Sequence, residues 1–265
     1  MTLDFLSSDS IKKGLRTKFI GSEIQYFDVT GSTNDIAKEL ARKGASEGLL
    51  VLAETQASGR GRLGRIWQSP PGGIWLSLML RPKLVPQEAP KLTFVGAIAV
   101  AAAIQNLGLD AKLKWPNDVL VSNRKICGIL TEMEAEMDVL HYVVMGIGIN
   151  ANFDRNSLPE DIQQTATTLK SELNSTISRN EFISHLLNEF EQSYLLFLEK
   201  GFPPILEEWK KLSCILGEDV LVYMDDKIID GTAIDVDQSG ALMLKLDNGS
   251  IKKIFSGDVS IRKRL

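Results

Sequence analysis

The C-terminal part of the chain carries the pattern that most limits its fold. After about Leu216, short alternating runs of apolar and polar residues are separated by three turn pairs, Asp225-Asp226, Ser239-Gly240 and Asn248-Gly249. Asn-Gly between alternating runs is among the strongest short signals of a β-hairpin. About five short strands fit into this segment, which predicts a small β-barrel. We therefore expect two domains, residues 1–214 and 215–265.

The preceding residues alternate between helical and strand-like patterns. Helices are expected where capping or stop residues bound amphipathic or apolar runs, at Ser32 to Lys43, Lys91 to Leu107, Glu181 to Leu198 and Pro204 to Leu212. Apolar runs of strand length cover Leu49 to Glu54, Ile74 to Leu80, Lys112 to Trp115, Lys125 to Glu134 and Val139 to Ile149. The last two runs predict an antiparallel hairpin. A connection rich in Gly, Arg, Ser and Pro, Thr55 to Gly73, separates the first two strands, and connections of this length are usually functional or mobile.

Composition excludes several classes of function. The formal net charge of -4 gives no overall basicity that calls for nucleic acid, so any anion site has to be a local group of cations. The two cysteines, Cys127 and Cys214, and two histidines are too few and too scattered for a zinc cage, and a structural disulfide is not expected. The N-terminus lacks the order of a signal peptide, and the most apolar stretch, Phe94 to Ile104, is too short to span a bilayer. We expect a cytoplasmic protein with no membrane partner and no dedicated metal site.

The segment Gly59 to Arg65, GRGRLGR, is the first candidate site. It satisfies the G-x-G-x-x-G pattern, but the Ser-Pro-Pro-Gly-Gly run that follows forbids the helix that a dinucleotide-binding fold opens there. The Walker pattern also fails, because no Lys-Ser or Lys-Thr follows the last glycine. Three arginines this close repel one another, so an empty loop should be loose, and a ligand with several negative charges would order it. A solvated surface loop is an alternative, and so is an RNA contact, although RNA-binding Arg-Gly segments usually repeat and this one occurs once.

Two further motifs follow strand-like runs. In Lys114 to Asp118, KWPND, the proline forces an extended entry and Asn-Asp suits a tight turn, so the motif is either a site or an ordinary strand-turn-strand corner. In Gly146 to Asn150, GIGIN, two glycines near a strand end allow a close approach to the backbone, and a β-bulge explains them equally well.

Taken together and in this order, the motifs resemble the biotin–protein ligases. The resemblance rests on Ser32-Thr33-Asn34, Gln56, GRGRLGR followed by Trp67, KWPND, Lys125 with Gly128, and GIGIN. It implies an α/β (α+β) fold, with a mixed, largely antiparallel sheet flanked by helices and followed by a small SH3-like β-barrel. Some members carry an N-terminal winged-helix domain and repress transcription. Because the match here begins at about Tyr26, we expect a monofunctional enzyme that lacks this DNA-binding domain and has no DNA partner.

The resemblance also implies a reaction. A biotin–protein ligase uses ATP and Mg²⁺ to convert biotin to biotinyl-5′-AMP, and transfers the biotinyl group to a lysine of a biotin carboxyl carrier protein domain. It implies a possible homodimer formed through sheet edges, and docking of the carrier against the exposed edge of the sheet. A lipoate–protein ligase, which has a related fold and the same two-step logic, is the alternative; GRGRLGR and KWPND argue against it. A non-catalytic biotin-binding module would need neither Lys125 nor the arginines.

Individual roles follow from the same resemblance. The residues expected to bind biotin are Ser32, Thr33, Asn34, Gln56, Gly59, Arg60, Arg62, Lys125 and Gly128. Those expected to bind ATP or the adenylate are Arg62, Arg65, Trp67, Lys114, Asn117 and Asn150. Lys125, Arg60 and Arg62 are expected to neutralise the reacting anions, and Asp118 to accept or direct the proton of the acceptor amine. Ordinary core packing is the alternative role for Trp67.

Overall fold

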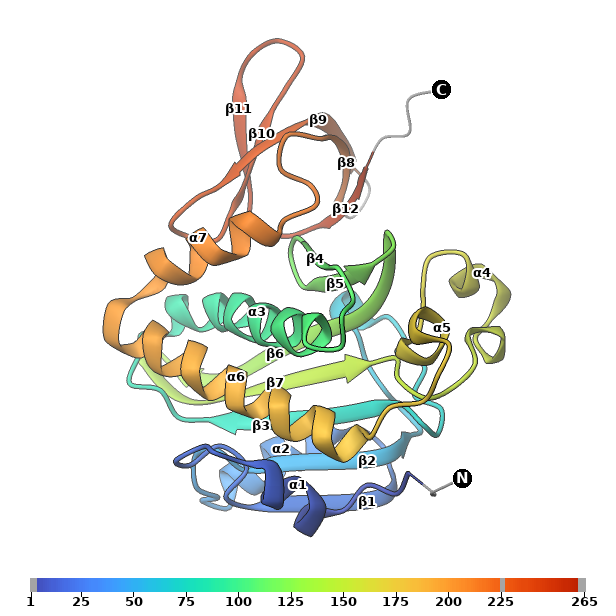
Figure 1. The fold of residues 1–265 in the computed structure, drawn as a ribbon. Coiled ribbons are helices and arrows are strands. Elements are labelled where there is room, and N and C mark those ends of the chain that lie inside the picture. Colours follow the sequence, from blue (N-terminus) through green and yellow to red (C-terminus); the bar gives the residue numbers. More distant parts are fainter. Residues whose placement is uncertain (1–3, 225–226, 262–265) are drawn as a thin grey trace.

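The computed structural model describes residues 4–224 and 227–261 and is built around a seven-stranded sheet (Figure 1). Its strands are β1 (Ile24–Thr30), β2 (Leu50–Gln56), β3 (Ile74–Leu80), β4 (Ala111–Lys114), β5 (Asp118–Val121), β6 (Arg124–Glu136) and β7 (Val139–Ile149). Their order is β1-β2-β3-β7-β6-β5-β4. β1 and β2 pair in parallel, and the other neighbours pair antiparallel. The predicted mixed, largely antiparallel sheet is therefore confirmed.

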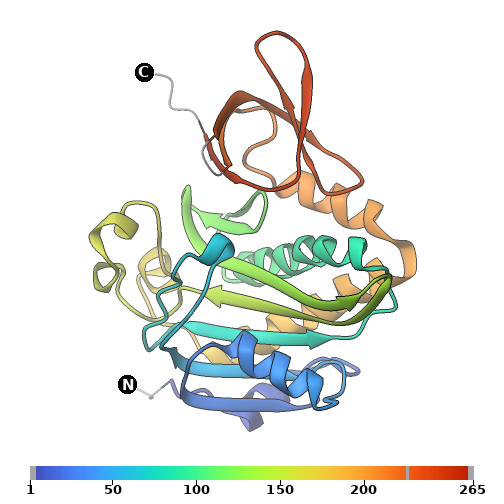
Figure 2. The same cartoon turned by 180° about the vertical axis from the view of Figure 1, so that it is seen from behind.

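Helices cover both faces of this sheet. They are α1 (Ser8–Gly14), α2 (Thr33–Arg42), α3 (Leu92–Gln105), α4 (Glu160–Gln163), α5 (Leu169–Leu173), α6 (Arg179–Lys200) and α7 (Phe202–Leu212), with 3-10 segments η1 (Arg62–Gly64), η2 (Pro86–Lys91) and η3 (Arg155–Ser157). α3 and α6 lie on one face (Figure 1), and α2 lies on the other (Figure 2). The four predicted helices are present. Within the described residues, no helix is long and apolar enough to cross a membrane.

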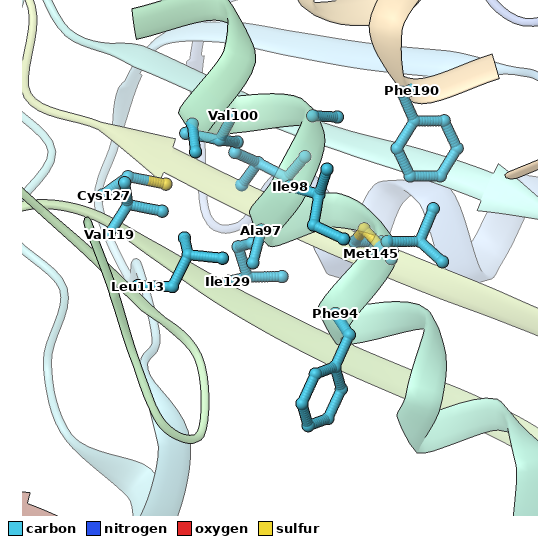
Figure 3. Close-up of a cluster of buried hydrophobic side chains, with 14 of the residues drawn as sticks. Phe94, Ala97, Ile98, Val100, Leu113, Val119, Cys127, Ile129, Met145 and Phe190 are labelled. Atoms are coloured by element: carbon cyan, nitrogen blue, oxygen red, sulfur yellow. The ribbon is translucent and has the colours of Figure 1, made fainter. Parts of the chain in front are cut away.

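Helix α3 explains how the main core is filled. Its side chains are mostly small and apolar, and nearly all are buried, because the helix lies between the sheet on one side and α6 and α7 on the other. Figure 3 shows Ala97 and Ile98 of α3 beside Ile129 and Met145 of the sheet. Such small side chains let a helix approach a sheet closely at high packing density. The face of the sheet beneath α3 is therefore rigid, and the opposite face is left for other elements.

The C-terminal residues form the predicted five-stranded unit, here called the barrel. Its strands are β8 (Asp219–Met224), β9 (Lys227–Val236), β10 (Leu242–Lys245), β11 (Ile251–Ile254) and β12 (Asp258–Ile261), in the order β11-β10-β9-β8-β12. Ser239-Gly240 and Asn248-Gly249 join strands as predicted, while Asp225-Asp226 lies outside the described residues. Trp115 Nε1 donates to the carbonyl oxygen of Gly240 at 3.0 Å. This contact seats the barrel against the β4–β5 corner.

Candidate functional site

One cavity of about 340 Å³ brings the sequence motifs together. The predicted residues that line it are Ser32, Thr33, Asn34, Gln56, Arg60, Arg62, Arg65, Trp67, Lys114, Asn117, Asp118, Lys125, Gly128 and Asn150. Gly59 is not among the lining residues, and its role in binding biotin stays a prediction. A Cβ at Gly59 would collide with the backbone oxygen of Trp67 and lie 2.7 Å from Ser69 Oγ. Gly59 is required for tight packing at the base of the loop, behind the cavity wall.

The floor of the cavity is formed by three glycines of the hairpin β6–β7, which we call the glycine floor: Gly128, Gly146 and Gly148. Gly128 and Gly148 face each other in the ladder. A Cβ at Gly148 would lie 2.5 Å from Trp67 Nε1, and one at Gly146 would collide with Asn34 Oδ1. The glycines therefore let side chains lie directly on the backbone, as GIGIN predicted. The β-bulge explanation is wrong, because the irregularity of this ladder lies at Glu134/Ala135.

A group of neutral polar side chains, the polar wall, borders the floor: the buried Ser32, Thr33 and Asn34, and the partly exposed Gln56. Gln56 Oε1 accepts from the backbone nitrogen of Thr33 at 2.9 Å. Gln56 Nε2 donates to Ser69 Oγ at 2.9 Å. Ser32 is the N-cap residue of α2, but its side chain makes no capping hydrogen bond. Several hydrogen-bonding groups thus converge on the cavity from the start of α2 and the end of β2.

The KWPND motif forms the charged corner of the cavity. It is a strand-turn-strand corner between β4 and β5, and three of its residues, Lys114, Asn117 and Asp118, line the cavity. Asn117 Nδ2 donates to the carbonyl oxygen of Ile129 at 2.7 Å, which fixes the turn to β6. Asp118 Oδ1 lies 2.6 Å from Lys125 Nζ, and its Oδ2 lies 3.4 Å from Lys114 Nζ. Two cations therefore share one carboxylate, which leaves a net positive corner that suits an anionic ligand.

The segment Gly59–Arg65, here called the arginine loop, closes the cavity on the barrel side. That the empty loop is loose stays a prediction; in the structure each guanidinium has a partner outside the loop. Arg60 binds both oxygens of Asp35 on α2, at 2.7 and 2.5 Å. Arg62 Nη1 donates to the carbonyl oxygen of Gly257 at 3.2 Å, and Arg65 pairs with Asp258 of β12. These partners spread the three positive charges apart.

Electrostatics differ along the loop. The hydrogen bond from Arg60 holds the pKa of Asp35 at about 2, below its usual value. Burial lowers the pKa of Arg62, because the charged guanidinium loses hydration there, although Asp258 and Asp118 oppose that effect. Sequence reasoning missed Asp35 and Asp258, and Asp258 lines the cavity itself. The barrel thus contributes directly to the site.

Trp67 lies across the glycine floor. A Cβ at Gly128 would lie 2.8 Å from its ring, Lys125 Nζ is 5.1 Å from a ring centroid, and Trp75 meets it edge-on. Among the described residues, its buried Nε1 has no hydrogen-bond partner. Trp67 therefore packs against the small cluster of Trp75, Phe153 and their neighbours, and also exposes a ring to the cavity. Core packing alone does not account for its position.

A second segment that sequence reasoning missed forms the opposite wall. It contributes Leu158, Ile162, Thr165 and Ala166 to the lining. The backbone nitrogen of Lys125 donates to the carbonyl oxygen of Thr165 at 2.8 Å, which fixes this wall to β6. The apolar spacing i, i+4, i+8 of Leu158, Ile162 and Ala166 was the available signal.

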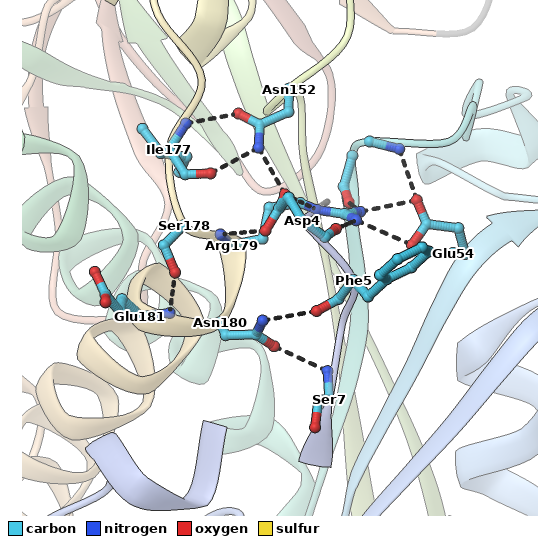
Figure 4. Close-up of polar contacts among 12 residues, drawn as sticks. Asp4, Phe5, Ser7, Glu54, Asn152, Ile177, Ser178, Arg179, Asn180 and Glu181 are labelled. Carbon is cyan, nitrogen blue, oxygen red and sulfur yellow. Dashed lines mark hydrogen bonds and ion pairs between the residues drawn. The ribbon is translucent and has the colours of Figure 1, made fainter. Parts of the chain in front are cut away.

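An ion cluster surrounds the buried side chain of Arg179, the first residue of α6 (Figure 4). Arg179 binds Glu54 at 2.9 Å and Asp4 at 2.6 Å, and donates to the carbonyl oxygen of Gly73 at 2.8 Å. Glu54 also accepts from the nitrogen of Gly72, whose carbonyl accepts from Asn152 at 2.7 Å. One guanidinium therefore ties the end of β2 to the residues that precede β3 and to the start of α6.

Comparisons with known proteins agree along most of the chain. Residues 26–150 match the biotin/lipoate A/B protein ligase family, and residues 215–262 match the biotin protein ligase C-terminal domain. A bifunctional ligase/repressor BirA of Bacillus subtilis is 40% identical over 97% of this chain and 79% of its own length. A biotin–[acetyl-CoA-carboxylase] ligase of Mycobacterium tuberculosis is 31% identical over 94% of both chains. A biotin protein ligase from Aquifex aeolicus, solved with biotin and ATP, superposes with a TM-score of 0.79 at 30% identity, covering 92% of this chain and all of that one.

Proposed function

The chain belongs to the biotin/lipoate A/B protein ligase family and is a biotin–protein ligase, and from this premise we propose how its cavity works. The enzyme joins the carboxylate of biotin to the α-phosphate of ATP, releasing pyrophosphate and forming biotinyl-5′-AMP. A lysine amine then attacks the acyl carbon and releases AMP. The observation that carries the assignment of residues is that one cavity combines a neutral wall, a glycine floor and a cationic corner.

We propose that the bicyclic ring of biotin lies against the polar wall. The hydrogen-bonding groups of the buried Ser32, Thr33 and Asn34 and of Gln56 suit the polar ureido group, and a largely buried polar wall rejects ligands that leave it unpaired. The valeryl chain would lie along Ile129, Leu130 and Ile147, beside the glycine floor. That direction leads the carboxylate to Lys125 and the backbone of Gly128.

In the first step two anions meet, so neutralisation is the main physical requirement. Lys125 and Lys114 would release Asp118 and bind the carboxylate of biotin and the α-phosphate instead. Arg60, Arg62 and Arg65 would close over the phosphates and exclude water. Trp67 would pack on adenine, with Asn117 and Asn150 near the nucleotide. The described residues contain no group of three side chains suited to a metal ion. We propose that Mg²⁺ arrives as MgATP, held mainly by phosphate oxygens and water.

In the second step the attacking amine must be neutral. Asp118 lines the cavity beside two lysines, so its carboxylate is placed to accept or direct the proton of the incoming ammonium. The acceptor would be a lysine of a biotin carboxyl carrier domain. The free edge strand β1, where Val29 is exposed, would serve carrier docking or a homodimer. The unpaired Cys127 and Cys214 fit a cytoplasmic enzyme.

The experiment is mass spectrometry of a biotin carboxyl carrier domain after incubation with the protein, biotin and MgATP. The acceptor lysine should gain one biotinyl group. Pyrophosphate exchange stimulated by biotin, and not by lipoate or octanoate, should accompany it. Exchange driven by lipoate would favour the lipoate-specific alternative, and an unmodified carrier would refute the proposed acceptor.

A further inference from the structure

Glu132 lies on β6 just outside the cavity lining, and its carboxylate accepts a hydrogen bond from the side chain of Asn34 in the polar wall. We propose that Glu132 is a positioning residue that makes this wall an acceptor of hydrogen bonds and thereby favours acids with ring N–H donors. The inference rests on the proposed placement of the biotin ring against this wall. It concerns a residue that does not touch the ligand.

The first step is the orientation of the Asn34 side-chain amide. Its Nδ2 lies 2.7 Å from Glu132 Oε2 and 3.4 Å from the carbonyl oxygen of Leu130. An ionised carboxylate and a carbonyl can only accept hydrogen bonds, so both hydrogens of Nδ2 point to this side. Asn34 Oδ1 is therefore turned the other way, over Gly146 and toward Ser77.

The second step passes from Asn34 to Thr33. The fully buried Ser77 hydroxyl lies 2.5 Å from Asn34 Oδ1 and 2.7 Å from Thr33 Oγ1. Ser77 has one hydrogen, and Asn34 Oδ1 cannot donate, so that hydrogen serves Asn34. The Thr33 hydrogen then goes to Ser77 or to Gln56 Oε1, which lies 3.1 Å away. In both cases Thr33, which is a lining residue, keeps at least one lone pair of Oγ1 for a ligand.

The third step is the match with ligand chemistry. The ureido ring of biotin carries two N–H donors, whereas the dithiolane ring of lipoate and the alkyl chain of octanoate carry none. A wall of buried acceptors pairs with the N–H groups of biotin, whereas lipoate and octanoate leave those acceptors without a partner. If Glu132 no longer enforced the orientation of Asn34, the amide would turn, and the Ser77 hydrogen would occupy a lone pair of Thr33.

Glu132 is itself fixed from the side away from the cavity. Its Oε1 lies 2.8 Å from Lys38 Nζ, and Lys38 lies 3.1 Å from Asp35, the partner of Arg60. The neighbouring Glu134 gives a matched comparison: it also joins β6 to α2, through Arg42 at 2.9 Å, but its hydrogen bonds do not reach the cavity lining. The two glutamates share strand, partner helix and charge, and differ in the contact with Asn34.

The test measures biotin-stimulated pyrophosphate exchange for Glu132→Gln and Glu134→Gln, with biotin and with analogues methylated at either ureido nitrogen. Glutamine keeps the shape but can also donate, so it no longer enforces the amide orientation. We expect Glu132→Gln to lower kcat/KM for biotin about tenfold, mainly through KM, and to lower it about twofold or less for at least one methylated analogue. Glu134→Gln should leave the preference for biotin over the analogues unchanged.

Lys38→Gln is the second variant, because it frees Glu132 without removing the acceptor; a smaller loss in the same direction is expected. Equal losses for biotin and both analogues, or the same change of preference in Glu134→Gln, would overturn the inference. Thermal unfolding of each variant separates these effects from global instability. A parent enzyme that gives no exchange with biotin would instead refute the proposed function.

Discussion

The glycine floor with its polar wall and the arginine loop line the same cavity, but they are held in place by different forces. The floor and wall rest on paired strands and on hydrogen bonds among residues that are almost fully buried, such as Asn34 and Ser77, with the carboxylate of Glu132 behind Asn34. The loop rests on ion pairs with side chains of α2 and the barrel, and its Leu63 is exposed, as is Ile66 directly after it. Partly exposed ion pairs contribute about 0–1 kcal/mol each. The floor and wall are thus suited to choosing the acid, and the loop to opening and closing over the adenylate.

The largest predicted effect lies where the two regions meet, at Asp118. Asp118→Asn removes the carboxylate that we propose takes a proton from the acceptor lysine, so transfer from preformed biotinyl-5′-AMP should slow about 100-fold. Adenylate formation should fall much less, because Lys125 and Lys114 remain. Single-turnover assays of the two half-reactions make the measurement.

The control for Asp118→Asn is Asp110→Asn, which removes a carboxylate that pairs with Lys112 at the surface near β4. It should leave both half-reactions unchanged. Equal losses in the two half-reactions of Asp118→Asn would mean that the carboxylate only positions Lys125.

The next effect tests the floor itself. A Cβ at Gly146 collides with Asn34 Oδ1, and the wall behind Asn34 has no space to yield, because Ser77 and Glu132 hold it. Gly146→Ala should weaken biotin binding about tenfold or more, measured by calorimetry, with a lower melting temperature. Gly31→Ala is the control, since a Cβ there meets nothing within 4 Å. Unchanged biotin affinity in Gly146→Ala would show that the floor is as adaptable as the loop.

The contrast between the glycine floor and the arginine loop also separates what could be predicted from the sequence from what could not. The motifs on strands and tight turns were found because a glycine or proline there is required by the local backbone conformation. Long elements were also clear: β3 and β7 begin and end at the predicted residues, and α3 at nearly the predicted ones. The edge strand β1 and the four-residue β5 were missed, since an edge strand with mixed exposure and a strand of one or two alternations carry little periodic signal.

The carboxylate partners of the arginine loop could not be predicted from the sequence for a different reason. Asp35 lies 25 positions from Arg60, and Asp258 comes from another domain of the predicted division. Such pairs depend on tertiary geometry and leave no pattern in a single sequence. The expectation of a loose loop followed from counting its positive charges alone. The chain supplies the compensating carboxylates from α2 and β12, which sequence spacing does not show.

A smaller effect is expected from opening the arginine loop. Arg62→Gly removes the donor to Gly257 and Asn117, so biotinyl-5′-AMP should escape about fivefold faster, and bystander lysines should become biotinylated. Leu63→Gly is the matched control, because it adds the same glycine to the loop at a residue with φ of 56° and keeps every guanidinium. Release is measured by filtration after a single turnover. If both variants released adenylate at the parent rate, the loop would not retain it.

The smallest effect concerns the pair Asp35–Arg60 and its dependence on pH. Because Arg60 holds the pKa of Asp35 at about 2, below the usual 3.8, the contribution of this pair is complete above about pH 4 and is lost only as pH falls through about 2. Adenylate retention should therefore show no change attributable to Asp35 between pH 5 and 8. Asp35→Asn should raise adenylate release at most about twofold throughout that range, since the side chain of Asp35 is half exposed. A larger effect, or one that appears only below pH 6, would mean that this ion pair carries more of the loop's closure than its exposure allows, and the contrast between a rigid floor and a weakly held loop would have to be redrawn.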